Sequence, residues 1–188
     1  MNIPTNNKGF SLVEVLVALL LTTVGILGMV TLQSRSIQHS QDSIQRNAAV
    51  GLAHDYIEMV RGQAQELYEF VPPKSPTNEK LKASSMFYKS KGSNFSGIAP
   101  CVTAASRIAE TAQEQLNCWI EAVQRTLPGA ASLLQSDMYI CRSSSPGTCD
   151  GKGSMLEVQL AWQTKENACL DAATPDATVC TYRVRVQL

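Results

Sequence analysis

The sequence has no cysteine in its first hundred residues and no proline between Pro4 and Pro72. It has almost no charge between Phe10 and Leu32, where Glu14 is the only charged residue. Over all 188 residues, 16 basic side chains balance 16 acidic ones, and no C-x-x-C pair occurs. The charge balance disfavours a strongly basic nucleic-acid binder, and the missing paired cysteines disfavour the common metal sites. Nucleic acid is therefore an unlikely partner, and no cofactor or metal is expected.

The apolar run from Phe10 to Leu32 predicts a membrane helix. Its 23 residues would span ~34 Å as a helix, enough to cross a hydrocarbon core of roughly 30 Å. Lys8 is the only charged side chain before it, and positive flanks stay cytoplasmic, which directs the rest of the chain outward. A cleaved secretory signal is the alternative, but its apolar region is shorter and ends at a small-residue cleavage site that is not evident here.

The same helix is expected to continue beyond the membrane. From Gln33 the sequence turns polar but keeps helix formers, and the apolar spacing stays helical to about Gln63. The predicted core-facing positions form two stripes, one of Ala48, Leu52, Tyr56 and Met59 running on from Ile44, the other of Val50, Ala53, Ile57, Val60, Ala64 and Leu67. We therefore predict a membrane half at 10–32 and an extracytoplasmic half at 33–70.

The remaining residues, 71–188, predict a globular α+β head. Prolines between Val71 and Pro76 end the long helix, and Lys74 to Pro100 is typical of a loop. A helix is expected from Ser106 to Leu127, followed by strands at Asp137–Arg142, Met155–Gln163 and Val179–Leu188. Alternating polar and apolar residues predict an antiparallel sheet packed on one face, with the long helix as its cover.

The six cysteines are interpreted as disulfides, because an exported head lies in an oxidising compartment. Six cysteines allow 15 pairings. Proximity along the chain favours Cys101 with Cys118, Cys141 with Cys149, and Cys169 with Cys180.

Other polar residues are interpreted as structural. His54 and Glu58 share a helix face and are read as a solvated pair rather than a metal site, and Arg183 and Arg185 as a solvated strand face. No set of nucleophile, base and orienting residue is evident, so the chain is not expected to be an enzyme.

Residues Lys8 to Leu19 resemble the N-terminus of a type IV prepilin. The resemblance implies that a prepilin peptidase removes residues 1–9 by cutting between Gly9 and Phe10, and then methylates the new amino terminus at Phe10. It implies an assembly role for Glu14, whose carboxylate would meet the cationic amine of a neighbouring subunit. An acidic group inside a membrane helix is costly without a partner or a function, which supports that role independently.

Residues 25–28 and 32–35 look like those of the PilV group of minor pilins. This narrower resemblance implies a pilin-like, disulfide-stapled subunit held in the inner membrane by a single pass, with its head in the periplasm, and later part of the pilus. Its implied partners are other major and minor pilins, the prepilin peptidase and the inner-membrane assembly platform, and its roles adhesion or twitching motility. The alternatives are a minor pseudopilin of a type II secretion system and a membrane-tethered pilin for DNA uptake or ligand binding.

Overall fold

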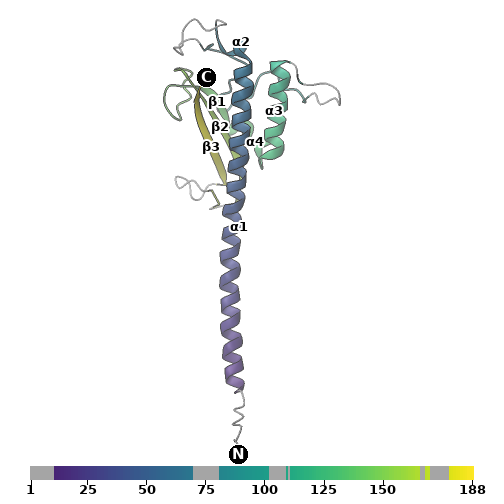
Figure 1. Cartoon of the computed structure of the whole chain (residues 1–188), viewed down its shortest axis with the longest axis vertical. Coiled ribbons are helices and arrows are strands. Elements are labelled where there is room, and N and C mark those ends of the chain that lie inside the picture. The colour runs from purple at the N-terminus through teal and green to yellow at the C-terminus, as the bar shows by residue number, and fades with distance from the viewer. Residues whose placement is uncertain (1–10, 70–80, 102–108, 110, 166–167, 170–177) are drawn as a thin grey trace, which may run out of the picture.

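The computed structural model describes residues 11–69, 81–101, 109, 111–165, 168–169 and 178–188 (Figure 1). Over these residues the helices are α1 (Leu12–Gly62), α2 (Ala64–Leu67), α3 (Ala112–Thr126) and α4 (Ala130–Ser136). The strands β1 (Tyr139–Ser143), β2 (Met155–Gln163) and β3 (Val179–Gln187) form an antiparallel sheet in the order β1-β2-β3. The predicted α+β class is confirmed. The leader residues 1–9, Phe10 and the segment Val71–Pro76 lie outside the described residues.

Helix α1 is one continuous helix of 51 residues, or ~76 Å at the usual rise. Its lower part projects from the head as a bare stem, and its upper part lies against the sheet with α3 beside it (Figure 1). The predicted continuity past the apolar run is confirmed. The chain departs from α1 at Gln63, the residue at which the sequence pattern placed its end.

The core of the head lies between α1, the sheet and α3. Helix α1 contributes six buried residues to it: Ala49, Leu52, Ala53, Tyr56, Ile57 and Val60. The inner face of β2 contributes Leu156, Val158, Leu160 and Trp162, which are fully buried. Two predicted core-facing residues do not take part, because Ile44 is 60% exposed and Val50 is 41% exposed.

An aromatic cluster joins α1 to α3 and to the loop at 81–101. The rings of Tyr56 and Trp119 lie 4.6 Å apart, and Phe95 meets Trp119 edge-on at 6.3 Å. The Trp119 indole N–H donates to the Leu52 carbonyl at 2.8 Å, and the Tyr56 hydroxyl donates to the Phe87 carbonyl. Burial raises the pKa of the Tyr56 hydroxyl well above its ordinary value. The segment predicted as loop is therefore fastened to the core by its aromatic side chains.

Helix α3 begins later than the predicted start at Ser106. Ala109 is not helical, residues 106–108 lie outside the description, and the helix begins at Ala112. A capping box sets this start: the Thr111 hydroxyl accepts from the Glu114 N–H, and the Glu114 carboxylate accepts from the Thr111 N–H. The predicted buried face is confirmed at Leu116, Trp119, Ile120, Val123 and Leu127.

The sequence pattern missed α4, a helix of seven residues that ends two residues before β1. As a result β1 begins at Tyr139 rather than at the predicted Asp137. Lys89 binds the turn between α4 and β1. Its buried ammonium donates to the Met138 carbonyl at 2.6 Å and to the Gln135 carbonyl at 3.4 Å. Burial lowers the pKa of Lys89 to about 8, although the nearby Asp137 carboxylate opposes the shift.

The turn before β2 depends on a glycine at position 153. Gly153 has φ +80°, and a Cβ there would lie 2.8 Å from the Ser144 Cα. Gly92 has nearly the same backbone conformation, φ +83°, with nothing within 4 Å of a Cβ. Alanine substitutions at the two positions therefore distinguish the energetic cost of a left-handed backbone from that of a steric clash.

Replacing Gly92 with alanine should lower the free energy of unfolding by about 1 kcal/mol, because only the backbone is strained. Gly153→Ala should cost about 3 kcal/mol, because the new methyl group also meets backbone atoms of the neighbouring strand end. Urea unfolding of the full chain in detergent, followed by tryptophan fluorescence, measures both. Equal losses in the two variants would contradict the proposed clash at position 153.

Candidate functional site

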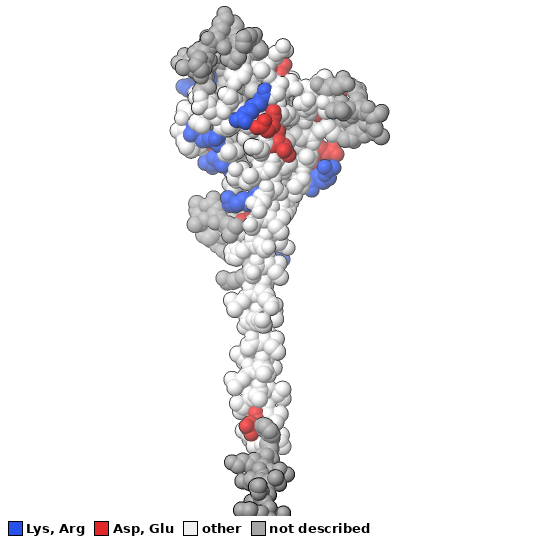
Figure 2. Space-filling view, viewed as in Figure 1, with Lys and Arg blue, Asp and Glu red and all other residues white. Residues whose placement is uncertain are grey.

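The lower half of α1 exposes its apolar side chains on every side. Among the described residues, α1 is the helix that is long and apolar enough to cross a membrane, and none of its most apolar stretch is buried in the protein. Figure 2 shows the stem nearly free of charged residues, which gather on the head. A helix that is apolar all round and uncovered by protein is suited to lipid or to other helices.

Glu14 lies in the first turn of α1, exposed among apolar neighbours. Over the described residues its carboxylate makes no hydrogen bond or ion pair. It borders a shallow groove formed with Val15, Ala18, Leu19 and Thr22 on the same side of the helix. The positive end of the helix dipole favours an acidic group here. Gly9 and Phe10, the predicted processing residues, lie outside the described part of the chain.

The threonines of the stem satisfy their hydroxyl groups within the helix. Thr22 donates to the Ala18 and Leu19 carbonyls at 3.0 and 2.9 Å. Thr31 donates to the Leu27 and Gly28 carbonyls at 3.2 and 2.8 Å. These bonds let polar side chains remain on a lipid-facing surface without unpaired donors. The Glu14 carboxylate, by contrast, has no hydrogen-bond partner in its own helix among the described residues.

All six cysteines form disulfides in the structure. The pairs are Cys101–Cys118, Cys141–Cys149 and Cys169–Cys180, the pairs nearest in sequence. Cys169–Cys180 ties β3 to the segment that follows β2, and Cys141–Cys149 ties β1 to its following loop. Each disulfide closes a local loop of the head, with sequence separations of 17, 8 and 11 residues.

Glu157 is a fully buried carboxylate on the outer face of β2. It accepts hydrogen bonds from the Tyr139 hydroxyl at 2.7 Å and the Ser143 hydroxyl at 2.8 Å. The Gly147 N–H points at both carboxylate oxygens, at 2.8 and 3.0 Å. The loop after β1 is therefore held down over the sheet by an acidic group that sequence alternation assigned to solvent.

The network fixes Glu157 as an anion. Burial alone raises the pKa of this carboxyl, but the hydrogen bonds from Tyr139, Ser143 and Gly147, with the charge of Arg183, outweigh it and hold the pKa below its ordinary value. Burial and the bond to Glu157 raise the pKa of Tyr139 to about 12. The carboxylate thus stays charged, and its phenol partner stays protonated, at neutral pH.

Arg183 is exposed, as the sequence predicted for this strand face, whereas Arg185 is half-buried, and both pair with Glu157. Their Nε atoms each lie 3.5 Å from a carboxylate oxygen of Glu157. Arg183 also donates to the Gln159 side chain at 3.1 Å, and Arg185 donates to the Ser143 carbonyl at 3.1 Å. The strand register places both arginines opposite these β2 partners. Both arginines therefore belong to the polar network around Glu157.

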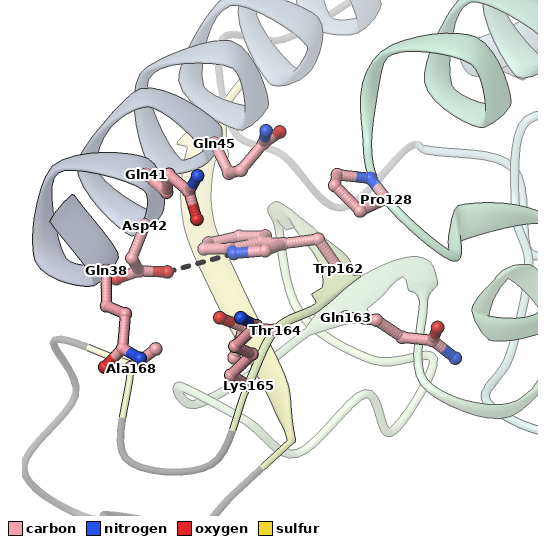
Figure 3. Close-up of a pocket in the computed structure, with 10 residues that line it drawn as sticks. All are labelled: Gln38, Gln41, Asp42, Gln45, Pro128, Trp162, Gln163, Thr164, Lys165 and Ala168. Carbon is pink, nitrogen blue, oxygen red and sulfur yellow. Dashed lines mark hydrogen bonds between the residues drawn. The ribbon is translucent and has the colours of Figure 1, made fainter. Parts of the chain in front are cut away.

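A hollow of about 440 Å³ lies at the base of the head, between α1 and the end of β2 (Figure 3). Gln38, Gln41 and Gln45 enter it from α1, and Trp162 lies beside them. The Trp162 indole N–H donates at 3.0 Å to Asp42, which is 1% exposed. Among the described lining residues there is neither histidine nor cysteine. The hydrogen bond from Trp162 to Asp42 fastens β2 to α1 where the helix leaves the head.

The histidines do not form a metal site in the described part of the chain. His39 and His54 are exposed on α1. Glu58, the expected neighbour of His54, pairs instead with Arg61 at 2.7 Å. No group of three or more His, Cys, Asp or Glu side chains among the described residues is placed to hold a metal ion.

Glu157→Gln should lower the free energy of unfolding by about 3 kcal/mol at pH 7, since it removes the charge of a fully buried carboxylate and leaves half-buried Arg185 beside a neutral amide. The folded pKa of Glu157 is depressed, so its contribution is present above the ordinary glutamate pKa of about 4.3 and is lost as the pH falls through the folded value. The difference in free energy of unfolding between wild type and Glu157→Gln should therefore become smaller at acidic pH.

The matched control is Glu58→Gln, which breaks the exposed pair with Arg61 and should cost less than about 0.5 kcal/mol. Urea unfolding of the full chain in detergent from pH 3 to pH 8 measures both variants. The proposed role of Glu157 is contradicted if Glu157→Gln lowers the free energy of unfolding as little as the control does. It is also contradicted if the loss does not depend on pH.

Comparison with known proteins gives one match. Residues 4–30 match the family described as the prokaryotic N-terminal methylation motif. No curated protein and no solved structure matched the chain. The matched residues cover the resemblance seen at 8–19 and the first half of the exposed stem, including Glu14. The motif and the bare apolar stem support a type IV pilin-like protein or pseudopilin, and the motif implies processing by a prepilin peptidase and assembly with other pilins.

Proposed function

We propose that the chain is a minor pilin of a type IV pilus that takes part in pilus assembly or initiation. The observation that carries the proposal is the coincidence of the methylation motif at residues 4–30 with the exposed, apolar half of a continuous 51-residue helix. In this layout residues 1–9 are the leader, 10–32 cross the inner membrane, 33–70 complete the helix and 71–188 form the head.

Assembly would proceed by charge pairing within the membrane. Cleavage after Gly9 creates a cationic, methylated amine on Phe10, at nearly the same depth as Glu14. The Glu14 carboxylate has no partner within the described chain, so an amine from a neighbouring subunit supplies its counter-charge. In a low-dielectric setting such a pair is much stronger than in water. Repeated head-to-tail addition of this kind makes an open helical filament.

The minor role rests on the resemblance of residues 25–28 and 32–35 to the PilV group. Such a subunit would work beside major and minor pilins and the inner-membrane assembly platform, and would influence adhesion or twitching motility from within the pilus. The periplasmic head with its three disulfides fits an oxidising compartment.

A minor pseudopilin of a type II secretion system is the second candidate, because the methylation motif fits that class equally well. Deletion of the gene separates the two candidates. Loss of surface pili with normal protein secretion supports the pilin, whereas normal pili with secreted enzymes retained in the cell supports the pseudopilin.

The mature chain should begin with N-methyl-Phe10, because Gly9 offers the peptidase a residue without a side chain at the scissile bond. Intact-mass analysis of protein extracted from membranes measures this directly. Cells lacking the prepilin peptidase serve as the control and should retain Met1 to Gly9. Retention of that leader in cells with an active peptidase would contradict the assignment.

Glu14→Gln should leave insertion and cleavage unchanged but deplete the mature chain from sheared pili by at least about tenfold. The change lowers the cost of insertion and lies beyond the bond that is cut, but it removes the partner of the Phe10 amine. Thr22→Val, in the same groove, is the control and should be incorporated normally, since the Thr22 hydroxyl bonds only within its own helix. Incorporation of the Glu14→Gln chain into pili at the wild-type level would contradict the proposed assembly role of Glu14.

A further inference from the structure

Strand β3 lies at one edge of the sheet. It pairs with β2 along one side, and in the order β1-β2-β3 no described strand follows it on the other side (Figure 1). The opposite edge of the sheet differs, because Ile140 of β1 exchanges two backbone hydrogen bonds with Lys89, at 2.7 and 2.8 Å. Strand β3 runs from Val179 to Gln187 without proline or glycine, the residues that most often interrupt strand pairing.

The backbone of β3 turns alternately toward β2 and away from it, and two hydrogen bonds fix the phase of this alternation. The Thr164 N–H donates to the Thr178 carbonyl at 2.8 Å, whereas the Gln163 N–H points to the Pro128 carbonyl, also at 2.8 Å. In an antiparallel ladder every second residue has the same orientation. The register therefore turns these β3 residues outward with their N–H and C=O groups: Val179, Thr181, Arg183, Arg185 and Gln187.

These outward groups, which we call the β3 edge, make no backbone hydrogen bond with any residue that the structure describes. Each of the five residues offers one donor and one acceptor, in the spacing of an existing strand. An extended peptide can add to such an edge and gain main-chain hydrogen bonds along its length. The β3 edge is therefore suited to a strand from another chain.

The side chains on the inner face of β3 form an apolar row that is only partly covered. Tyr182, Val184 and Val186 pack against the core but remain half-buried. Their partners in the register, Leu160 and Val158 among them, are fully buried in β2. The apolar layer of the sheet thus ends at β3 with accessible surface, and apolar side chains of an added strand would extend it.

The side chains on the outer face of β3 carry excess positive charge. Arg183 and Arg185 both lie 3.5 Å from the single carboxylate of Glu157, which cannot neutralise two guanidinium groups. The Arg183 side chain is 45% exposed. Acidic residues opposite the two arginines would supply the missing counter-charge, whereas a second copy of β3 would bring arginine beside arginine.

From this geometry we infer that the β3 edge binds an extended segment of another protein in which acidic and apolar residues alternate. The backbone of the segment pairs with the outward groups of β3. Its acidic side chains lie beside Arg183 and Arg185, and its apolar side chains lie beside Val184 and Val186. The inference concerns the head alone and goes beyond the proposed function, because it holds equally for a pilin and a pseudopilin.

Residue-resolved amide hydrogen exchange of the full chain in detergent tests the pairing. The probe is a short peptide of alternating glutamate and valine, and its control is a peptide of alternating lysine and valine. In the free chain, the outward amides of β3 should exchange at least about tenfold faster than the amides that face β2. The glutamate peptide should slow the outward amides at least about tenfold, and the lysine peptide should leave them unchanged.

Three outcomes of this experiment would overturn the inference. The outward amides could be protected already in the free chain, which would mean that the edge is covered. They could be protected equally by both peptides, which would remove the role of charge. They could become protected as the concentration of the chain rises without a probe, which would make a second copy the occupant.

A pair of substitutions at Thr181 tests the backbone separately from the side chain. Thr181→Pro removes an outward N–H, and proline is compatible with the extended backbone of the preceding Cys180. This variant should bind the glutamate peptide at least about tenfold more weakly by fluorescence anisotropy, with the exchange of its inward amides unchanged. Thr181→Val keeps the N–H and should bind like wild type.

Gln187→Pro makes the same change at the end of the strand and replaces Thr181→Pro if that variant does not fold. Binding of the glutamate peptide at the wild-type level by a folded proline variant would contradict strand addition at this edge.

Photo-crosslinking in native membranes tests the occupant. A photoreactive residue at Gln187 should crosslink to a peptide of alternating acidic and apolar residues, identified by mass spectrometry, and one at Gln124, exposed on α3, should not. A crosslink no stronger than that from Gln124, or one to a helical stem or to β3 of a second copy, would overturn the assignment. None of these readouts requires filaments, so failure of the proposed function and failure of the inference are distinguishable.

Discussion

The internal hydrogen bonding of α1 is the constraint on which the rest of the molecule depends. A bilayer offers no partners to backbone N–H and C=O groups, so a spanning segment must satisfy them within itself. The absence of proline from residue 5 to residue 71 lets that condition hold over the whole helix rather than over the apolar part alone. The same helix that is long and apolar enough to cross a membrane therefore enters the head as the longest described element, and the head is built around its upper end.

The head is small, and hydrogen bonds of buried polar groups join several of its parts. Asp42 binds Trp162 across 120 positions of sequence, Lys89 holds the turn before β1, and Glu157 holds the loop after it. Each of these ionisable groups would be costly if left unpaired. Small exported domains also depend on disulfides, since their cores bury too little surface. Polar anchors and disulfides meet at one place, where Cys141–Cys149 closes the loop that covers Glu157.

Sequence periodicity predicted the long helix, β2 and β3 closely, because these elements are long and their apolar spacing is set by one dominant neighbour. It failed where a local interaction decided the outcome. The capping box at Thr111 and Glu114 was visible in the sequence and would have placed the start of α3 correctly. Helix α4 is too short for periodicity to reveal it. Ile44 follows the spacing of the buried stripe, yet it lies on the opposite side of α1 from the sheet.

Glu157 shows a different limit. Alternation along β2 correctly separates two faces, but it cannot tell whether the polar face meets water or a loop from elsewhere in the chain. The cover depends on Gly147 and on two arginines of β3, which are brought together only by strand register. Processing between Gly9 and Phe10, by contrast, stays a prediction from sequence: both residues lie outside the described part of the chain, and the matched motif at residues 4–30 contains them.

The two sides of α1 have different surroundings above its apolar half, and their residue compositions differ accordingly. The side facing the head must match β2 and α3, so it carries Asp42, Arg46 and the buried residues from Ala49 to Val60. The other side carries Ile37 and Ile44, which are 58% and 60% exposed, and Gly51, where a Cβ would meet nothing within 4 Å. Among the described residues, the head therefore covers one side of the upper part of α1 and leaves the other side exposed.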